Sequence, residues 1–249
     1  MDDTLAIFTE AKNRFHVVGI LGMDSCGKTD FFDVVRSQKL MAATQLEPLT
    51  QLLIKGYAED NNLEIPRKFA QYGINVLDSE GKPYWDENVL NEIWKLAVDE
   101  LNFGKDLCDL AFPKAMQSIG ERIKVYLEAM PDIQRRFNVP LFIELPLASN
   151  VNYKDYVDTL ISIVRPSTYS DEDWYVKSKV SETGERYLYR FSPYFTSIDL
   201  AKQFLKQRDR VWRHINIEAD IIIENTGSRE EFIQKSLDCV SSIKQQLNF

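Results

Sequence analysis

The segment Gly22–Thr29 constrains the fold of this chain more than any other stretch. It reads Gly-Met-Asp-Ser-Cys-Gly-Lys-Thr and directly follows the apolar run His16–Leu21. The spacing G-x-x-x-x-G-K-[ST] is that of a phosphate-binding loop, which joins a buried strand to a helix. The apolar run before the segment and the helical pattern over Thr29–Ser37 supply that context, so the sequence predicts a strand, a phosphate-binding loop and a helix.

Each position of this loop has an expected task. Gly22 and Gly27 are expected to allow the backbone angles that turn amide N–H groups toward an anion, and the helix that begins near Lys28 points its positive dipole end there. Lys28 is expected to reach the β- and γ-phosphates of ATP, and the Thr29 hydroxyl to ligate Mg²⁺. The residues between the glycines are expected to line the nucleotide site with their main chain: Asp24, Ser25 and Cys26.

Composition limits the classes of protein to consider. With 249 residues and 44% hydrophobic content, the chain can form one large α/β domain, or one domain that carries a sub-domain. The formal net charge of −8 argues against general binding to nucleic acid or anionic membranes. The sequence has no apolar run of membrane-spanning length, no basic, apolar leader and only three scattered cysteines, so it predicts a reduced, cytoplasmic protein without a membrane span.

Short apolar runs alternate with helical patterns along the chain. The runs predicted as strands are His16–Leu21, Leu40–Ala43, Pro140–Leu147, Thr159–Val164 and Ala219–Glu224. The predicted helices are Thr29–Ser37, Asp86–Leu101, Pro113–Met130, Ile198–Arg213 and Ser228–Leu247. In the last helix, Ser228 and Glu231 fit the S-x-x-E capping box. This alternation predicts an α/β fold in three layers, with a parallel sheet covered by helices on both faces.

Ligands of such sheets bind at the carboxyl ends of the strands, where this sequence places several polar side chains. Gly22, Glu144 and Asn225 each stand at a predicted strand end and are expected to converge on one crevice. Glu144 is expected to hold a Mg²⁺-bound water and to act in catalysis, or else to cap nearby backbone groups or pair with an arginine as a structural carboxylate. Asn225 is expected to contact the nucleotide, or else only to shape the turn that it begins.

Two long segments interrupt the alternation within what is predicted as a single domain of residues 1–249. Residues 45–130 are predicted to form a helical region on the acceptor side, and residues 167–197 a lid-like insertion or a plain surface insertion. Arginine forks suit phosphate oxygens, and two arginines are predicted to clamp the phosphates: Arg190, with a catalytic role, and Arg208, with a nucleotide-binding one.

Read together, the loop and the distal segments resemble the dephospho-coenzyme A kinase family of P-loop kinases. The segments that carry the resemblance are Val18–Gly22 with Gly27–Thr29, Ile143–Leu147, Tyr156–Val164 and Ala219–Ser228. The resemblance implies a P-loop NTPase fold with a helical substrate side and a lid. It also implies ATP and Mg²⁺ as cofactors, and phosphoryl transfer to a nucleotide-type small molecule.

The chain departs from this family on the acceptor side. The family carries an Asp-Ala-Asp run on its second strand, where this chain has Met41-Ala42-Ala43-Thr44, and Phe112 stands where the family has a His. Phage-type deoxynucleoside monophosphate kinases also lack that run, and they have a strand ending in Val-Arg-Pro that resembles residues 164–166. The acceptor is therefore either dephospho-coenzyme A or a deoxynucleoside monophosphate.

Two further hypotheses about function concern proteins that are not small-molecule kinases. The missing carboxylates are compatible with a nucleotide-binding protein that no longer catalyses. A GTPase switch is disfavoured, because the sequence has no Asn-Lys-x-Asp run that would read guanine. In either kinase reading the partner is a small molecule, with no nucleic acid and no membrane, and the sequence leaves the oligomeric state open.

Overall fold

The computed structural model describes residues 2–22, 26–44, 107–130, 138–148, 151–165 and 219–249. The chain divides into two compact units, of which the first comprises Met1–Gln45, Ala115–Ser167 and Arg210–Phe249. The second comprises Leu46–Lys114 and Thr168–Asp209. Almost all described residues belong to the first unit. The assignment of residues 45–130 to the acceptor and of 167–197 to a lid stays a prediction.

The described strands form one parallel sheet in the order β2-β3-β1-β4-β5. In chain order they are β1 (His16–Gly22), β2 (Met41–Ala43), β3 (Pro140–Glu144), β4 (Thr159–Val164) and β5 (Ile221–Glu224). The central strand β1 is paired on both sides, with Gly19 opposite Ile143 of β3 and Leu160 of β4. Every residue of β1 from Val17 to Gly22 is buried, as expected for a strand covered on both faces. The predicted α/β architecture with a parallel sheet is confirmed.

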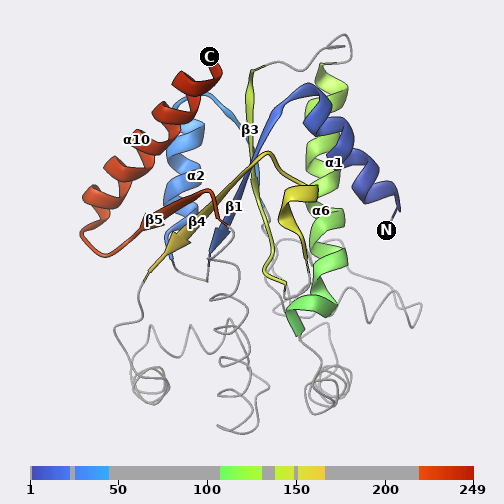
Figure 1. The fold of residues 1–249 in the computed structure, drawn as a ribbon, viewed down its shortest axis with the longest axis horizontal. Coiled ribbons are helices and arrows are strands. Elements are labelled where there is room, and N and C mark those ends of the chain that lie inside the picture. The colour runs from blue at the N-terminus through green and yellow to red at the C-terminus, as the bar shows by residue number, and fades with distance from the viewer. Residues whose placement is uncertain (1, 23–25, 45–106, 131–137, 149–150, 166–218) are drawn as a thin grey trace, which may run out of the picture. The chain divides into compact units, whose positions relative to one another are not determined.

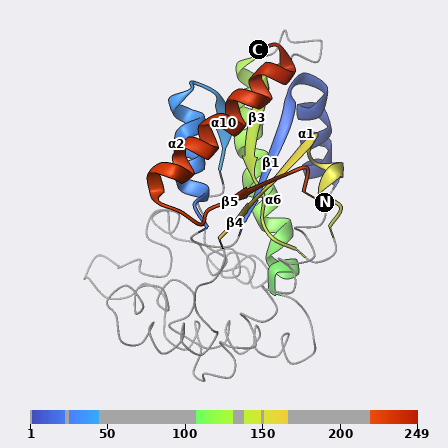
Figure 2. The ribbon, with the colours of Figure 1, turned by 60° about the vertical axis from the view of Figure 1, so that its left-hand side comes forward.

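Helices α2 (Lys28–Ser37) and α10 (Arg229–Leu247) cover one face of the sheet and pack against each other (Figures 1 and 2). Both helices are amphipathic, and their buried side chains recur at helical spacing. Those of α10 are Phe232, Ser236, Val240 and Ile243. The capping box predicted for α10 is present, because Ser228 Oγ accepts from the Glu231 amide and the Glu231 carboxylate accepts from the Ser228 amide.

Helices α1 (Asp2–Arg14) and α6 (Leu107–Ala129) lie on the opposite face of the sheet (Figures 1 and 2). The two helices meet at Gly120, where an added Cβ would lie 3.4 Å from Ile7 Cδ1. Tyr126 of α6 closes the outer side of β2, since its hydroxyl donates to the Ala42 carbonyl at 2.9 Å and accepts from the Ala42 amide at 3.3 Å. These bonds occupy main-chain groups that would otherwise be open to another strand.

The helices differ from the sequence prediction in two respects. Helix α1 was not predicted, although Phe8, Ala11 and Phe15 are buried at the spacing of one helix face. Helix α6 begins at Leu107, before Pro113, where the sequence predicts its start. Pro113 is exposed inside the helix, so solvent can hydrate the carbonyl that loses its N–H donor. The predicted helices over 86–101 and 198–213 lie outside the described residues. Within the described ranges, no helix is both long and apolar enough to cross a bilayer.

Two aspartates join neighbouring strands at the end of the sheet away from the phosphate loop. Asp158 donates its amide to the Val17 carbonyl and accepts the Val17 amide on its carboxylate, at 2.8 and 2.9 Å. Asp220 repeats the arrangement on Leu160, at 2.9 and 2.7 Å, and also pairs with Lys154. Each carboxylate therefore satisfies a main-chain donor at the start of a strand and fixes its register.

We predict that Asp220→Asn lowers stability in a pH-dependent way. Burial raises the pKa of Asp220, but hydrogen bonds from Lys154 and the Leu160 amide, with the Lys154 charge, outweigh it and hold the pKa below its usual value. The charged form thus stabilises the fold above the unfolded-state pKa, near 4, and this contribution is lost as the pH falls through the lower folded-state value. Because the pair is partly exposed and screened, we expect a loss of about 1 kcal/mol at pH 7.

Urea unfolding between pH 7 and pH 3 measures this difference between the wild type and Asp220→Asn. The difference should shrink below about pH 4, where the unfolded-state carboxylate becomes protonated. Asp238→Asn is the control, because it removes an exposed charge of α10 and leaves both strand joins intact. A difference that stays constant over the whole pH range would contradict the role given to the Asp220 charge.

Candidate nucleotide-binding site

The strand order creates a switch point at the carboxyl end of β1. After β1 the chain forms β2 and β3 on one side of this strand, and then crosses to form β4 and β5 on the other side. In open parallel sheets, ligands bind beside the strand ends at such a point. The segment Gly22–Thr29 begins at this end of β1 and leads directly into α2.

The two glycines of the loop are required for different reasons. Gly27 is the N-cap of α2 and has φ +112°, a backbone conformation that side chains disfavour. Gly22 has no such angle. It is needed for space, because an added Cβ would lie 2.4 Å from Cys26 Sγ and 3.1 Å from the Ile163 carbonyl. The expected unusual backbone angle is therefore found at Gly27, whereas Gly22 is restricted by space, and the role of both glycines in turning amide N–H groups toward an anion stays a prediction.

Lys28 lies between a main-chain carbonyl and a carboxylate. Its Nζ donates to the Gly22 carbonyl at 2.7 Å, across the base of the loop, and lies 3.9 Å from Glu144 Oε1. Glu144 ends β3, next to β1, and both side chains are about one-sixth exposed. Thr29 follows on the first turn of α2 and is exposed to solvent. An ammonium, a carboxylate and a hydroxyl thus gather at the end of the central strands.

The turn after β5 is attached to the loop. Asn225 extends the pairing of β5 with β4 by donating its amide to the Val164 carbonyl at 2.7 Å. Its side-chain Nδ2 donates to the Cys26 carbonyl, also at 2.7 Å. One turn later, Phe232 packs over Gly27, where an added Cβ would lie 2.7 Å from the ring. A polar contact and an apolar contact therefore hold the Cys26–Gly27 peptide from one side.

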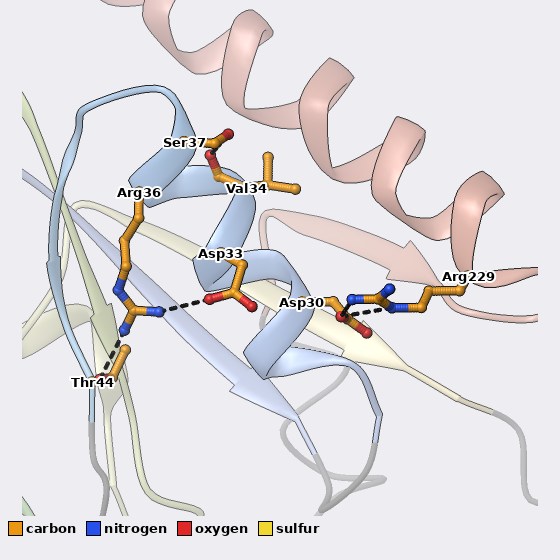
Figure 3. A network of polar contacts seen from close by, with 7 residues as sticks. All are labelled: Asp30, Asp33, Val34, Arg36, Ser37, Thr44 and Arg229. Atoms are coloured by element: carbon orange, nitrogen blue, oxygen red, sulfur yellow. Dashed lines mark hydrogen bonds and ion pairs between the residues drawn. The ribbon is translucent and has the colours of Figure 1, made fainter.

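An ion pair joins the first turns of the two helices on this face. Arg229 of α10 donates from Nε and Nη2 to Asp30 Oδ1 of α2, at 3.0 and 2.7 Å (Figure 3). The Arg229 side chain is 67% exposed, so solvent screens much of the attraction. The pair aligns the starts of α2 and α10 but contributes little energy.

At the end of β2, a second arginine, Arg36, contacts the position where the resembling family carries a carboxylate. Thr44 is buried, and its Oγ1 accepts from Arg36 Nη2 at 3.3 Å. Arg36 reaches down from the last turn of α2 and is paired with Asp33 at 3.0 Å (Figure 3). The strand end therefore presents a hydroxyl beside a guanidinium, where the resembling family has carboxylates.

The structure brings together part of the predicted site. Gly22, Cys26, Gly27, Lys28 and Thr29 form the described part of the loop, and Glu144 and Asn225 contact it from neighbouring strand ends. The remaining predicted residues lie outside the described ranges: Asp24, Ser25, Arg190 and Arg208.

Sequence reasoning missed the contacts that α10 makes with the loop. The capping box had located the start of α10 at Ser228, and Phe232 and Arg229 follow it within one turn. The signal for a buried Phe232 was present in the apolar spacing of the helix. No sequence pattern indicated that this helix would pack on Gly27.

We predict opposite outcomes for two glycine-to-alanine substitutions. Gly27→Ala places a side chain at positive φ and against the Phe232 ring, so it should destabilise the protein by about 2 kcal/mol. Gly120→Ala is the matched control, because it adds the same methyl group inside α6 at ordinary contact distance and should be neutral or stabilise by about 0.5–1 kcal/mol. Urea unfolding measures both. Equal effects would contradict the strained geometry assigned to Gly27.

Comparison with known proteins gives relatives over nearly the whole chain. The dephospho-CoA kinase of Chlamydia trachomatis serovar D is 25% identical over 232 residues, covering 91% of this chain and 96% of that protein. That of Chlamydia muridarum is 24% identical over 233 residues, with the same coverage. A solved dephospho-CoA kinase from Campylobacter jejuni is 21% identical and covers 93% of this chain and 98% of its own, with a TM-score of 0.49. No protein-family model matches the chain.

The relatives align over 91% of this chain, in which β1, the loop and α2 follow one another as a phosphate-binding loop requires. The chain is therefore similar to dephospho-CoA kinases over nearly its whole length, and its parallel sheet with flanking helices has the α/β architecture of a P-loop NTPase fold.

Proposed function

We propose that this protein transfers the γ-phosphoryl group of ATP to a nucleotide-type small molecule. The observation that carries the proposal is the position of Lys28, held between the Gly22 carbonyl and Glu144 at the switch point of the sheet. A loop of this sequence supplies amide N–H groups and one ammonium to a triphosphate. Relatives named dephospho-CoA kinase support the same reaction class.

Phosphoryl transfer depends on positioning and on neutralising charge more than on covalent catalysis. In the proposed complex, Lys28 exchanges the Gly22 carbonyl for phosphate oxygens. This exchange is favourable because the phosphates carry full negative charge. Arg190 and Arg208 remain the predicted clamps on the phosphates.

Two groups suit a Mg²⁺ ion that accompanies ATP. The Thr29 hydroxyl is exposed on the first turn of α2, and the Glu144 carboxylate lies near Lys28 on the neighbouring strand end. Mg²⁺ prefers oxygen ligands and is commonly held by one or two side chains together with substrate phosphates. The ion would neutralise charge on the β- and γ-phosphates.

The acceptor divides into two chemical classes. A hydroxyl acceptor, such as dephospho-coenzyme A, needs a base, and the Glu144 carboxylate, 3.9 Å from Lys28 Nζ, is a candidate for it. A monophosphate acceptor is already anionic and needs no base. The hydroxyl of Thr44 and the guanidinium of Arg36 at the end of β2 favour this second class, because they replace carboxylates that would repel a phosphate.

We predict that Lys28→Ala lowers kcat/KM for ATP by about 100- to 1000-fold, since it removes the charged donor aimed at the transferred phosphoryl group. Lys12→Ala is the matched control. It removes an ammonium that also donates to a main-chain carbonyl, that of Lys154 at 2.8 Å, but on α1. A coupled assay of ADP formation measures both variants. Equal activity of Lys28→Ala and the wild type would contradict the proposal.

We predict that ADP formation depends on the acceptor. The wild type is incubated with ATP and Mg²⁺, and with dephospho-coenzyme A or one deoxynucleoside monophosphate at a time, against a sample without acceptor. The proposal requires saturable ADP formation with a member of one class. ATP binding without acceptor-dependent turnover on any of them would overturn the enzymatic proposal and indicate a nucleotide-binding protein that does not catalyse.

A further inference from the structure

The Cys26–Gly27 peptide is held in one orientation by a side chain from another part of the fold. No described peptide bond is cis, so the Cys26 carbonyl and the Gly27 N–H point in opposite directions across this peptide plane. The carbonyl accepts from Asn225 Nδ2 at 2.7 Å. The Gly27 N–H is therefore directed away from the β5–α10 turn.

This peptide would rotate easily without that bond. Gly27 has no side chain to favour one backbone conformation. Its φ is +112°, and glycine adopts negative φ values about as readily. A flip would exchange the directions of carbonyl and N–H. It would turn an acceptor toward the side on which the loop presents donors, and an oxygen there would repel a phosphate.

We propose that Asn225 is a positioning residue for the phosphate-binding loop, and that it raises affinity for the triphosphate by locking the Cys26–Gly27 peptide. The inference rests on the proposed function. It adds that the turn after β5 fixes the orientation of a peptide in the phosphate-binding loop. Asn225 acts here through Cys26. Its Nδ2 donates one of its two N–H groups to the loop carbonyl, which directs the side chain toward the loop.

Three contacts join the segment from the end of β5 into α10 to the loop and to α2, and among them only the Asn225 bond fixes the direction of the Cys26 carbonyl. The Asp30–Arg229 pair is exposed and acts between helices, away from the loop peptide. Phe232 packs on the Gly27 Cα and limits space, but a ring does not select the direction of a carbonyl. The partly buried amide–carbonyl bond selects it directly.

The test compares ligands that share the phosphates and differ in the base. Calorimetry measures binding of MgATP and of inorganic tripolyphosphate to the wild type, Asn225→Ala, Asn225→Asp and Lys235→Ala. Asn225→Asp keeps the shape but turns a carboxylate oxygen toward the carbonyl. Lys235→Ala is the matched control, since it removes another side-chain bond from α10, to the Glu224 carbonyl at 2.9 Å, without touching the loop.

We expect Asn225→Ala to weaken tripolyphosphate and ATP equally, by about tenfold, as the loss of one hydrogen bond implies. Asn225→Asp should weaken both at least as much, and Lys235→Ala should change neither beyond about twofold. The fitted stoichiometry separates weaker binding from loss of folded protein, because misfolding lowers the number of sites and leaves their affinity unchanged.

Two results would overturn the inference alone. In the first, Asn225→Ala weakens ATP and leaves tripolyphosphate unchanged, which indicates contact with the base. In the second, both affinities equal those of the wild type. Failure of the wild type itself to bind either ligand would instead overturn the proposed function, and the two failures are told apart by the wild-type titration.

Discussion

The candidate site depends on the orientation of the Cys26–Gly27 peptide. The Cys26 carbonyl and the Gly27 N–H belong to the same trans peptide, so a partner that holds the carbonyl on one side also fixes the direction of the amide on the other. Asn225 is that partner, at the end of β5. Because β5 is reached through β4 from the central strand, the geometry of the loop depends on the assembly of this half of the sheet.

Contacts at the opposite end of the sheet stabilise the strand registers on which the position of Asn225 depends. Asp158 and Asp220 fix the registers of β4 against β1 and of β5 against β4, by satisfying the first main-chain donors of the neighbouring strand. A slip of either strand would move every side chain to the other face. It would also displace Asn225 from the Cys26 carbonyl. The two aspartates lie far from the loop along the strands, yet they determine whether the β5–α10 turn can reach it.

Much of this arrangement could be predicted from local sequence. The run from His16, the loop and the helix after it were predicted because strand, glycine and helix signals agree there. The start of α10 followed from Ser228 and Glu231, whose capping bonds are local. The alternation of strands and helices was enough to predict the parallel sheet.

The rest depends on contacts between distant residues. Asn225 and Cys26 are 199 positions apart, and Asp30 and Arg229 are equally distant, so no periodicity indicates either bond. The lack of space at Gly22 could not be predicted either, because it comes from the Cys26 thiol and the Ile163 carbonyl, which only the fold brings close. Helix α1 was missed although its spacing was readable, since the strand and loop signals that follow it are stronger.

The phosphate-binding loop and the end of β2 differ in how far they match the family that the sequence resembles. The loop keeps the phosphate-binding sequence motif, including its two glycines, Lys28 and Thr29. Glu144 lies near Lys28 at the end of β3. The end of β2 instead carries Ala43 and Thr44, with Arg36 bonded to the hydroxyl. Arg36 is also paired with Asp33, so the main difference from a carboxylate pair is the absence of charges that would repel an anionic acceptor in the proposed reaction.

A crystal structure with Mg²⁺ and a non-hydrolysable ATP analogue tests the central claim most directly. The account predicts that the triphosphate lies along the loop. Lys28 Nζ should have left the Gly22 carbonyl for the β- and γ-phosphates, while Asn225 Nδ2 still bonds the Cys26 carbonyl. A nucleotide bound elsewhere, or a triphosphate in the loop with the Cys26–Gly27 peptide flipped and the Asn225 bond broken, would contradict it.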